Sequence, residues 1–324
     1  MAAIILANTE GMSRDEWLAL RTKGLGGSDI AAVAGVSGWG GAAGVFLEKT
    51  GAAPPKEESE AMQWGHYLEP EIAKRFAERE GLEIRRVPYI LQHPEHPWAL
   101  ANLDFEIVDP LAGNGVLEIK NVGRYRAPQF DDGALPPDVE CQVRWYMAIT
   151  GYSYAFVSAL LGGNELAIRF VERDLEIEKY LIKIGGEFWQ MVEANEMPAM
   201  DSNPRTGQML AQMFAKSRPE AIELPAKAMD HINRWIGRNA DIKALQAIQD
   251  EAENELKALL QENEIGICGK FQASWKSITT KRLDGKALEE AEPDVYKRFL
   301  KESSYRRFGV REVKAPKEKK RKKG

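Results

Sequence analysis

Cysteine is scarce in this 324-residue chain. Only Cys141 and Cys268 are present, far apart in the sequence, and no Cys-x-x-Cys pair occurs. Zinc sites and iron–sulfur clusters are usually built from closely spaced cysteines, and disulfide-stabilised folds need several pairs. The sequence therefore argues against all three kinds of site, and we expect both thiols to be reduced.

Long apolar runs are missing as well. No uninterrupted apolar stretch reaches the roughly 20 residues that a membrane-spanning helix needs. Residues 1–10 lack the basic start that is typical of a secretory signal. We therefore expect a cytoplasmic protein without membrane segments. Its length permits one large domain plus an appendage, or two ordinary domains.

The chain has no overall excess of positive charge. Its formal net charge is −5, and because residues 314–324 contribute +6, residues 1–313 carry −11. This balance is a modest argument against nucleic acid as a partner. Acidic metal ligands can nevertheless coexist with a locally basic groove, so the motifs carry more weight than the total charge.

The most informative stretch is a predicted β-hairpin. Apolar and polar residues alternate along residues 102–108, and residues 116–120 have the same strand character. Residues 109–115 between them contain proline, glycine and asparagine and are expected to form the turn. The two arms should therefore pair antiparallel.

Three charged side chains should meet on this hairpin. Successive strand residues point to opposite faces, so Glu118 and Lys120 project from one face and Ile119 from the other. If the turn is centred near residues 111 and 112, antiparallel pairing places Asp104 across from residues 118–120, with a one-residue uncertainty in register.

Two carboxylates and an ammonium group in this arrangement suit phosphodiester hydrolysis. Carboxylate oxygens are ligands that Mg²⁺ prefers, and the metal activates water and neutralises charge on the phosphate. A lysine adds a fixed positive charge beside the attacking water. The alternative is a surface hairpin whose charged residues are only solvated. Asp…Glu-x-Lys on a hairpin resembles the active-site pattern of the PD-(D/E)XK nuclease superfamily.

Two further segments carry candidate site residues. Residues 24–29 are rich in glycine and lead into a predicted helix, whose first turn offers free N–H groups and the Ser28 hydroxyl to a phosphate. The alternative is that Ser28 or Asp29 only caps this helix. Glu69, just before Pro70 in another predicted helix, is either a third carboxylate of the site or an ordinary surface residue.

An ordered set of motifs strengthens the resemblance. In chain order they are Arg21 with Gly26–Ile30, Trp64-Gly65 with Leu68-Glu69-Pro70, Trp98–Asp104, Glu118-Ile119-Lys120, and Gln142–Gly151. Together, over roughly residues 10–200, they resemble the YqaJ-type viral recombinases, phage exonucleases similar to lambda exonuclease. We expect an α/β fold, a PD-(D/E)XK core with a mixed central β-sheet flanked by helices.

The resemblance also implies roles for the hairpin residues. Asp104 and Glu118 would ligate catalytic Mg²⁺ ions, with the Ile119 backbone carbonyl as a further ligand. Glu69 would complete the second of two metal positions, at which Mn²⁺ can substitute. Lys120 would position or activate the water.

The same resemblance implies DNA-binding residues. Arg21 and Ser28 would grip a terminal 5′-phosphate, and Gln142, on a helix predicted over residues 138–150, would face the same cleft. That helix places Val139, Val143, Tyr146 and Met147 at helical spacing for burial and leaves Gln142 and Trp145 near its edges. A buried structural glutamine is the alternative for Gln142. Apart from the resemblance, basic residues interleaved with aromatic ones suit contacts with a DNA backbone, and the alternative is that they are only strand surface and local core. The candidate DNA contacts elsewhere are Arg124, Arg126, Lys276, Arg306 and Arg307.

The C-terminal third is expected to be a separate module. We predict a nuclease domain over residues 1–200, a linker over 201–225, an α+β module over 226–313 and a basic tail over 314–324. The module should contain a long helix or helical hairpin, then a β-hairpin, two short helices and a final strand near residues 304–310. The tail either adds sequence-independent DNA affinity or is only a solvated end.

The predicted long helix has two rows of residues with the seven-residue spacing of a coiled coil. One row contains Trp235, Ile242 and Leu256 and is interrupted by Gln249, and the other contains Leu245, Ala252 and Leu259.

The activity implied by the resemblance is a Mg²⁺-dependent 5′-to-3′ exonuclease. It would degrade one strand of linear double-stranded DNA from 5′-phosphorylated ends and leave 3′ overhangs for recombination by single-strand annealing. The resemblance further implies a homotrimeric ring, a single-strand annealing protein as partner, and a phage or prophage origin in a bacterial host. Two alternatives are a PD-(D/E)XK endonuclease in restriction or repair, and a non-catalytic DNA-end-binding scaffold.

Overall fold

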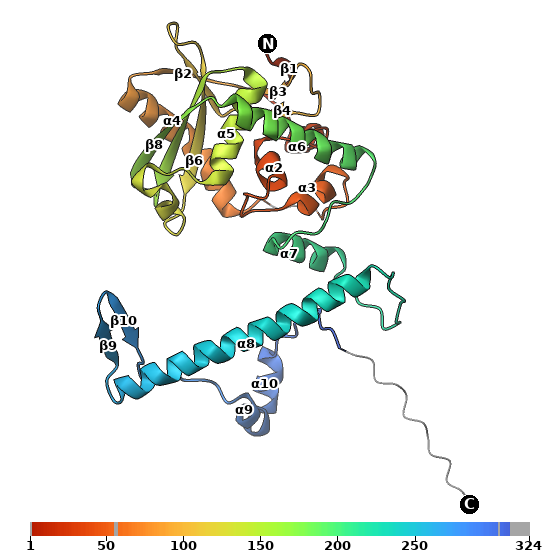
Figure 1. The fold of residues 1–324 in the computed structure, drawn as a ribbon, viewed down its shortest axis with the longest axis vertical. Coiled ribbons are helices and arrows are strands. Elements are labelled where there is room, and N and C mark those ends of the chain that lie inside the picture. The colour runs from red at the N-terminus through yellow and green to blue at the C-terminus, as the bar shows by residue number, and fades with distance from the viewer. Residues whose placement is uncertain (1, 55–57, 304, 312–324) are drawn as a thin grey trace, which may run out of the picture. The chain divides into compact units, whose positions relative to one another are not determined.

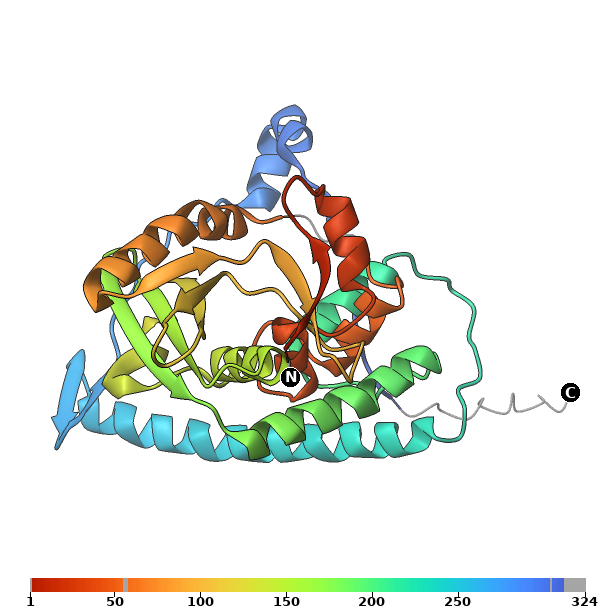
Figure 2. The same ribbon diagram turned by 90° about the horizontal axis from the view of Figure 1, so that it is seen from above.

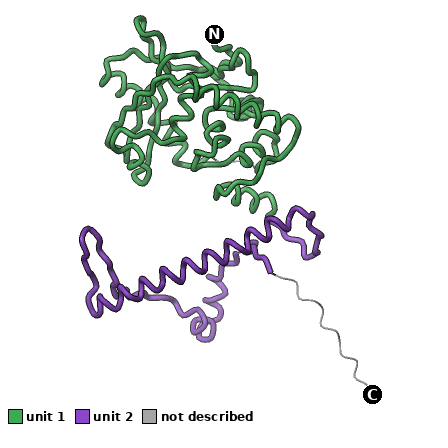
Figure 3. Tube along the Cα trace, in the orientation of Figure 1, with its two compact units in different colours: residues 1–214 green, residues 215–324 purple. Residues whose placement is uncertain are grey.

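The computed structural model describes residues 2–54, 58–303 and 305–311. These residues form two compact units, residues 1–214 and residues 215–324 (Figure 3). The predicted basic tail lies outside the described residues. In the described part of the chain, no helix combines the length and the apolar character needed to cross a membrane.

A five-stranded mixed sheet organises the first unit (Figure 1). In spatial order it contains β2 (Glu83–Arg86), β5 (Phe105–Val108), β6 (Gly115–Val122), β7 (Tyr154–Leu161) and β8 (Glu165–Glu172). β6 and β7 are parallel, and the other neighbours are antiparallel. A parallel pair needs a crossover connection, which here contains the helix α5 (Pro137–Thr150). The predicted α/β class with a mixed sheet is confirmed.

Helices cover both faces of this sheet (Figure 2). α4 (Glu60–Glu80) packs Ile72 and Phe76 into one apolar cluster with Leu117 and Ile119 of β6. α5 packs on the opposite face, in a second cluster that includes Val116 and Val122 of the same strand. β6 is therefore buried from both sides, and its alternate residues belong to different cores.

The remaining elements of the first unit surround this core. A three-stranded antiparallel sheet is formed by β1 (Ile4–Asn8), β3 (Tyr89–Gln92) and β4 (Leu100–Ala101). The other helices are α1 (Arg14–Arg21), α2 (Gly27–Val33), α3 (Ala42–Lys49), the 3₁₀ helix η1 (Ala127–Gly133), α6 (Leu175–Glu193) and α7 (Pro204–Met213).

The first arm of the predicted hairpin is shorter than the sequence indicated. β4 ends at Ala101 and pairs with β3, whereas β5 begins only at Phe105 and pairs with β6. The intervening residues 102–104 are a connection between two sheets, so the predicted start of the strand at residue 102 is wrong. Asp104 lies at the end of this connection, immediately before β5.

The second unit is built on one long helix, α8 (Ala228–Leu260). A hairpin of β9 (Ile265–Cys268) and β10 (Phe271–Ser274) follows, and then the short helices α9 (Gly285–Ala291) and α10 (Pro293–Phe299). The long helix, the hairpin and the pair of short helices agree with the prediction. The expected final strand is wrong, because the described residues 305–310 contain no strand.

Candidate active site

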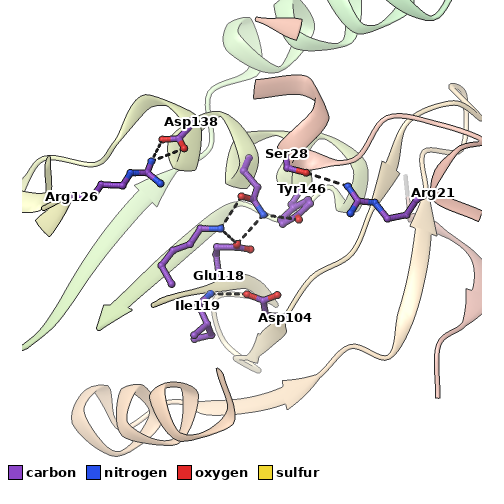
Figure 4. A network of polar contacts seen from close by, with 10 residues as sticks. Arg21, Ser28, Asp104, Glu118, Ile119, Arg126, Asp138 and Tyr146 are labelled. Carbon is purple, nitrogen blue, oxygen red and sulfur yellow. Dashed lines mark hydrogen bonds and ion pairs between the residues drawn. The ribbon is translucent and has the colours of Figure 1, made fainter. Parts of the chain in front are cut away.

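The carboxylates and the lysine of the hairpin meet on the face of β6 that α5 covers (Figure 4). Phe105 pairs with Leu117, so continuing this antiparallel register by one residue places Asp104 opposite Glu118. Ile119 points to the other face and joins the apolar cluster under α4. The predicted separation of Glu118 and Lys120 from Ile119 is therefore confirmed.

Glu118 is held by two donors through one of its oxygens. Its Oε1 accepts hydrogen bonds from Lys120 Nζ at 2.5 Å and from Gln142 Nε2 at 2.8 Å. Lys120 Nζ also donates to Gln142 Oε1 at 3.0 Å, which closes a ring of three side chains. Glu118 is only 2% exposed, and its Oε2 is buried without a hydrogen-bond partner among the described residues.

The carboxylates of Asp104 and Glu69 contribute to the same electrostatic environment. Asp104 Oδ2 accepts a hydrogen bond from the Ile119 N–H at 2.8 Å. Burial, together with the charges of Glu118 and Glu69, raises the pKa of Asp104 well above its usual range. Burial also raises the pKa of Glu69 on α4, and the charge of Glu118 adds to this effect. Three acidic groups are thus close enough to disfavour one another's ionisation.

Lys120 stays protonated in this environment. Burial by itself lowers the pKa of the amine, but the neighbouring charges of Glu118 and Asp104 outweigh it and raise the pKa above the usual value. Lys120 is therefore a fixed positive charge beside the carboxylates, which suits the stabilisation of an anionic phosphate more than the abstraction of a proton.

Gln142 contacts this cluster from α5, and Tyr146 supports it. Gln142 Nε2 donates to the Tyr146 hydroxyl at 2.9 Å, one helical turn along α5. Burial and the charges of Glu118 and Asp104 raise the pKa of Tyr146 well above its usual range, so the hydroxyl stays neutral. The sequence indicated Tyr146 only as a core residue, although its four-residue spacing from Gln142 is the signal for such a contact.

Trp145 does not lie near the edge of α5. It is fully buried, and its Nε1 donates to the Leu100 carbonyl at 3.0 Å. The prediction was wrong because α5 packs against β4 and α6 as well as the central sheet, so that more than one stripe of the helix is covered.

The residues at this site fit a bound divalent cation. The described residues contain no ready-made group of three or more Asp, Glu, His or Cys side chains that could hold a metal. Glu118 Oε2 is nevertheless buried without a donor among the described residues. Burial and the charges of Glu118 and Glu69 raise the pKa of Asp104, and a cation beside these carboxylates would oppose that effect. Hard carboxylate oxygens are the donors that Mg²⁺ and Mn²⁺ take.

A second polar cluster joins α1, α2 and α3. Arg21 Nη2 donates to Ser28 Oγ at 3.2 Å, which brings together the two residues predicted to bind a 5′-phosphate (Figure 4). Asp29 lies 3.5 Å from the same Arg21 nitrogen and 2.6 Å from Lys49 Nζ, and it accepts from the Gly26 N–H at 2.9 Å. The guanidinium also lies 4.8 Å from the centre of the Trp17 ring. Arg21 is therefore fixed in place by its neighbours.

Asp29 connects the residues of this second cluster, because its carboxylate contacts Arg21, Lys49 and the Gly26 N–H. Burial raises its pKa, but the charges of Lys49 and Arg21 outweigh burial and leave the pKa below its usual value. The expected capping role is present, since Asp29 caps the N-terminus of α2 at Gly26. The contact with Lys49 could not be predicted from sequence, because Lys49 lies on a different helix.

The two clusters touch where α2 packs on α5. A Cβ atom at Gly27 would lie 2.7 Å from Gln142 Cγ and 2.8 Å from Tyr146 Cε1. These distances leave no room for a side chain, so the helix start that carries Ser28 is in direct contact with the residues that hold Glu118. A group bound at Ser28 and Arg21 would therefore lie next to the carboxylate–lysine cluster.

The other predicted DNA contacts of the first unit, Arg124 and Arg126, have partners among neighbouring residues. Arg126 donates to Asp138 Oδ2 at 2.6 Å and to Gln129 at 2.9 Å, and Arg124 stacks on Tyr125 with 4.9 Å to the ring centre. The remaining three, Lys276, Arg306 and Arg307, belong to the second unit.

Comparison with known proteins gives one family match and one close relative. The model of the YqaJ-like viral recombinase domain matches residues 16–153. A Bacillus subtilis protein described as uncharacterized protein YqaJ is 36% identical over 316 residues, which cover 96% of this chain and 98% of that protein.

Solved structures give weaker similarity. LHK-Exo in complex with dAMP is 21% identical, with a TM-score of 0.48, over 56% of this chain and 94% of that one. The alkaline exonuclease LHK-Exo from Laribacter hongkongensis is 20% identical, with a TM-score of 0.47, over 61% of this chain and 99% of that one.

Proposed function

Because the chain belongs to the YqaJ-like viral recombinase family, we propose that it is a Mg²⁺-dependent exonuclease that acts on linear double-stranded DNA. The observation that carries this proposal is the ring of Glu118, Lys120 and Gln142 beside Asp104, with one oxygen of Glu118 left without a donor. A buried cluster of this kind is costly unless a ligand or a reaction uses it.

Asp104, Glu118 and Glu69 would hold the metal, with the Ile119 carbonyl as a further ligand. The bound cation would supply an activated water and neutralise charge on the scissile phosphate. Gln142 holds Glu118 and Lys120 in fixed orientations through both ends of its amide. Lys120 presents its ammonium group to the attacking water and the phosphate, where fixed positive charge lowers the barrier.

Arg21 and Ser28 would bind the 5′-phosphate of a DNA end. The guanidinium is already oriented by Asp29 and by the Trp17 ring, so little conformational entropy remains to be lost on binding. A phosphate held there would set the distance from the DNA end to the catalytic cluster. On this basis we propose 5′-to-3′ polarity and a 3′ single-stranded product, which a single-strand annealing protein could use. The homotrimeric ring stays a prediction.

The decisive experiment uses linear duplexes labelled at either strand end, with and without 5′-phosphate, in Mg²⁺ or EDTA. Closed-circular DNA is digested in parallel. We expect Mg²⁺-dependent loss of label from 5′-phosphorylated ends, no attack on the circle, and no activity in Lys120→Ala. Lys179→Ala is the matched control, because Lys179 is an exposed lysine that forms a surface ion pair with Glu176 on its own helix.

Two results would contradict the proposal in different ways. Cleavage of the closed circle would favour a PD-(D/E)XK endonuclease. Binding of DNA ends without cleavage in Mg²⁺ or Mn²⁺ would favour a non-catalytic scaffold.

A further inference from the structure

The long helix of the second unit exposes an apolar seam. α8 has 33 residues and is therefore roughly 50 Å long. Ile242, Leu245, Leu256 and Leu259 are 63%, 66%, 50% and 79% exposed. Among the described residues of the second unit, Leu260 is the single buried apolar side chain. So much exposed apolar surface along one helix indicates that a partner covers it.

The seam follows a heptad repeat. One row contains Trp235, Ile242, Gln249 and Leu256, and the other contains Arg238, Leu245, Ala252 and Leu259. The rows alternate with steps of three and four residues, which is the spacing of the two core positions of a coiled coil. Two of these eight positions, Arg238 and Gln249, are polar.

Part of the seam has neighbours within its own chain. The Trp235 ring lies 6.0 Å from the Phe308 ring in an edge-to-face contact, and Lys257 lies 5.7 Å from the Trp275 ring centre. Between these two places, residues 240–256 are all exposed in the described part of the chain. A surface hollow of about 350 Å³ follows it, lined by His231, Arg234, Trp235, Arg238, Asn239 and Ile242.

We propose that α8 pairs antiparallel with α8 of a second copy of this chain. In the register that places Ile242 against the partner's Leu245, the numbers of two facing residues add up to 487. Six of the eight seam positions then face one another, while Leu256 and Leu259 face the partner's His231 and Ala228. Arg238 then faces the partner's Gln249, so the two polar positions meet each other. Trp235 faces the partner's Ala252, so the largest seam residue meets the smallest.

Charge supports the antiparallel direction. The N-terminal half of α8 has a net charge of +1, from Arg234, Arg238 and Lys243 against Asp230 and Asp241. The C-terminal half has a net charge of −3, from Asp250, Glu251, Glu253 and Glu255 against Lys257. In the proposed register, Arg234 flanks the seam beside the partner's Glu255, and two-fold symmetry produces this pair twice. Parallel pairing would instead place Arg238 against the partner's Arg238 within the seam, where like charges repel.

Cysteine cross-linking tests this register in the full-length protein. One copy carries Ile242→Cys and the other Leu245→Cys, each with a different affinity tag, in a Cys268→Ser background. The remaining Cys141 is buried in the first unit. On mild oxidation we expect cross-linked dimers when the two copies are co-expressed, and none above background from either copy alone, since only the mixed pair faces across the seam.

Other outcomes would overturn the proposal. Cross-linking of each single variant with itself would show a parallel pair. Cross-linking of Ile242→Cys with Leu256→Cys would show a different register, because Leu256 lies 11 residues from Leu245, roughly 16 Å along the helix. A complete lack of cross-links would show that the seam does not bind a second copy. This readout is independent of any assembly through the first unit and of the proposed activity.

Charge reversal gives a second measurement. We expect Arg234→Glu alone and Glu255→Arg alone to raise the dissociation constant of the α8 pair by about 2–10-fold, and the double variant to restore it. Glu251→Arg is the matched control, since its position points away from the seam. The proposal fails if the dissociation constant of the double variant is as high as that of the single variants. It also fails if Glu251→Arg raises the dissociation constant by the same factor.

Discussion

Lys120 Nζ and Glu118 Oε1 lie 2.5 Å apart, and the amide of Gln142 bonds to both of them. Glu118 therefore has one oxygen committed to protein donors and one, Oε2, that has none among the described residues. A carboxylate arranged in this way can take a cation at its second oxygen without releasing the lysine. This division of the two oxygens supports the proposed metal-binding role of Glu118.

A metal-binding role for Glu118 predicts a specific effect on stability. We expect Mg²⁺ to raise the melting temperature of the wild-type protein relative to EDTA, because a ligand present at 100 times its dissociation constant stabilises the folded state by about 2.7 kcal/mol. Glu118→Gln should remove most of this increase, since the amide does not neutralise the cation. Thermal unfolding with and without Mg²⁺ measures the rise in melting temperature for the wild type and for Glu118→Gln. An unchanged Mg²⁺ effect in Glu118→Gln would contradict the assignment.

Recognition of the 5′-phosphate by Arg21 predicts a change in end preference. Loss of a charge-assisted hydrogen bond is worth about 1.5–3 kcal/mol, so Arg21→Gln should reduce the preference for phosphorylated over hydroxyl ends by about 10–100-fold. The measurement is the ratio of initial rates on the two substrates. Arg14→Gln is the matched control, because Arg14 lies on the same helix and pairs with Glu58 at 3.0 Å. Equal losses on both substrates in Arg21→Gln would argue for a structural role.

The hairpin residues of the candidate site could be predicted because local rules determine them. Period-two alternation places Glu118 and Lys120 on one face, and the position of the turn places Asp104 opposite them. The start of the first arm could not be predicted in the same way. Residues 102–104 continue the alternation, but Ala101 is already paired in another sheet.

The contacts around Arg21 illustrate what local rules do not determine. Asp29 and Lys49 are 20 residues apart and meet only because α2 and α3 pack together. The burial of Trp145 likewise depends on which elements surround α5. Such contacts follow from tertiary packing, which neither helical periodicity nor capping preference encodes.

The lowered pKa of Asp29 predicts a pH-dependent contribution to stability. Its charged form is favoured in the folded state, so the contribution is present above the unfolded-state pKa of about 3.9 and is lost as pH falls through the lower folded-state value. Asp29→Asn should cost about 3 kcal/mol of unfolding free energy at pH 7, because the buried Lys49 loses its ion-pair partner. The difference from wild type should shrink as pH falls below about 4.

Urea unfolding of the wild type and of Asp29→Asn, from pH 7 to below about pH 4, measures the difference in their free energies of unfolding. Glu176→Gln is the control, since Glu176 forms an exposed pair with Lys179. A difference that stays constant with pH would show that the cost comes from packing and not from the charge of Asp29.

The contact between α2 and α5 predicts that a single methyl group at Gly27 disturbs both clusters. Its Cβ would lie less than 3 Å from Gln142 and from Tyr146, so Gly27→Ala should cost about 1–3 kcal/mol of unfolding free energy. Nuclease activity should fall further than stability alone explains, because displacement of Gln142 alters its bonds to Glu118 and Lys120. Gly207→Ala is the matched control, since Gly207 lies in α7 with nothing within 4 Å of its Cβ position. This substitution should raise the free energy of unfolding by about 0.5–1 kcal/mol, because alanine favours a helix more than glycine does. Urea unfolding and initial rates at saturating Mg²⁺ measure the two effects. Full activity in a stably folded Gly27→Ala would show that the amide of Gln142 does not position the catalytic residues.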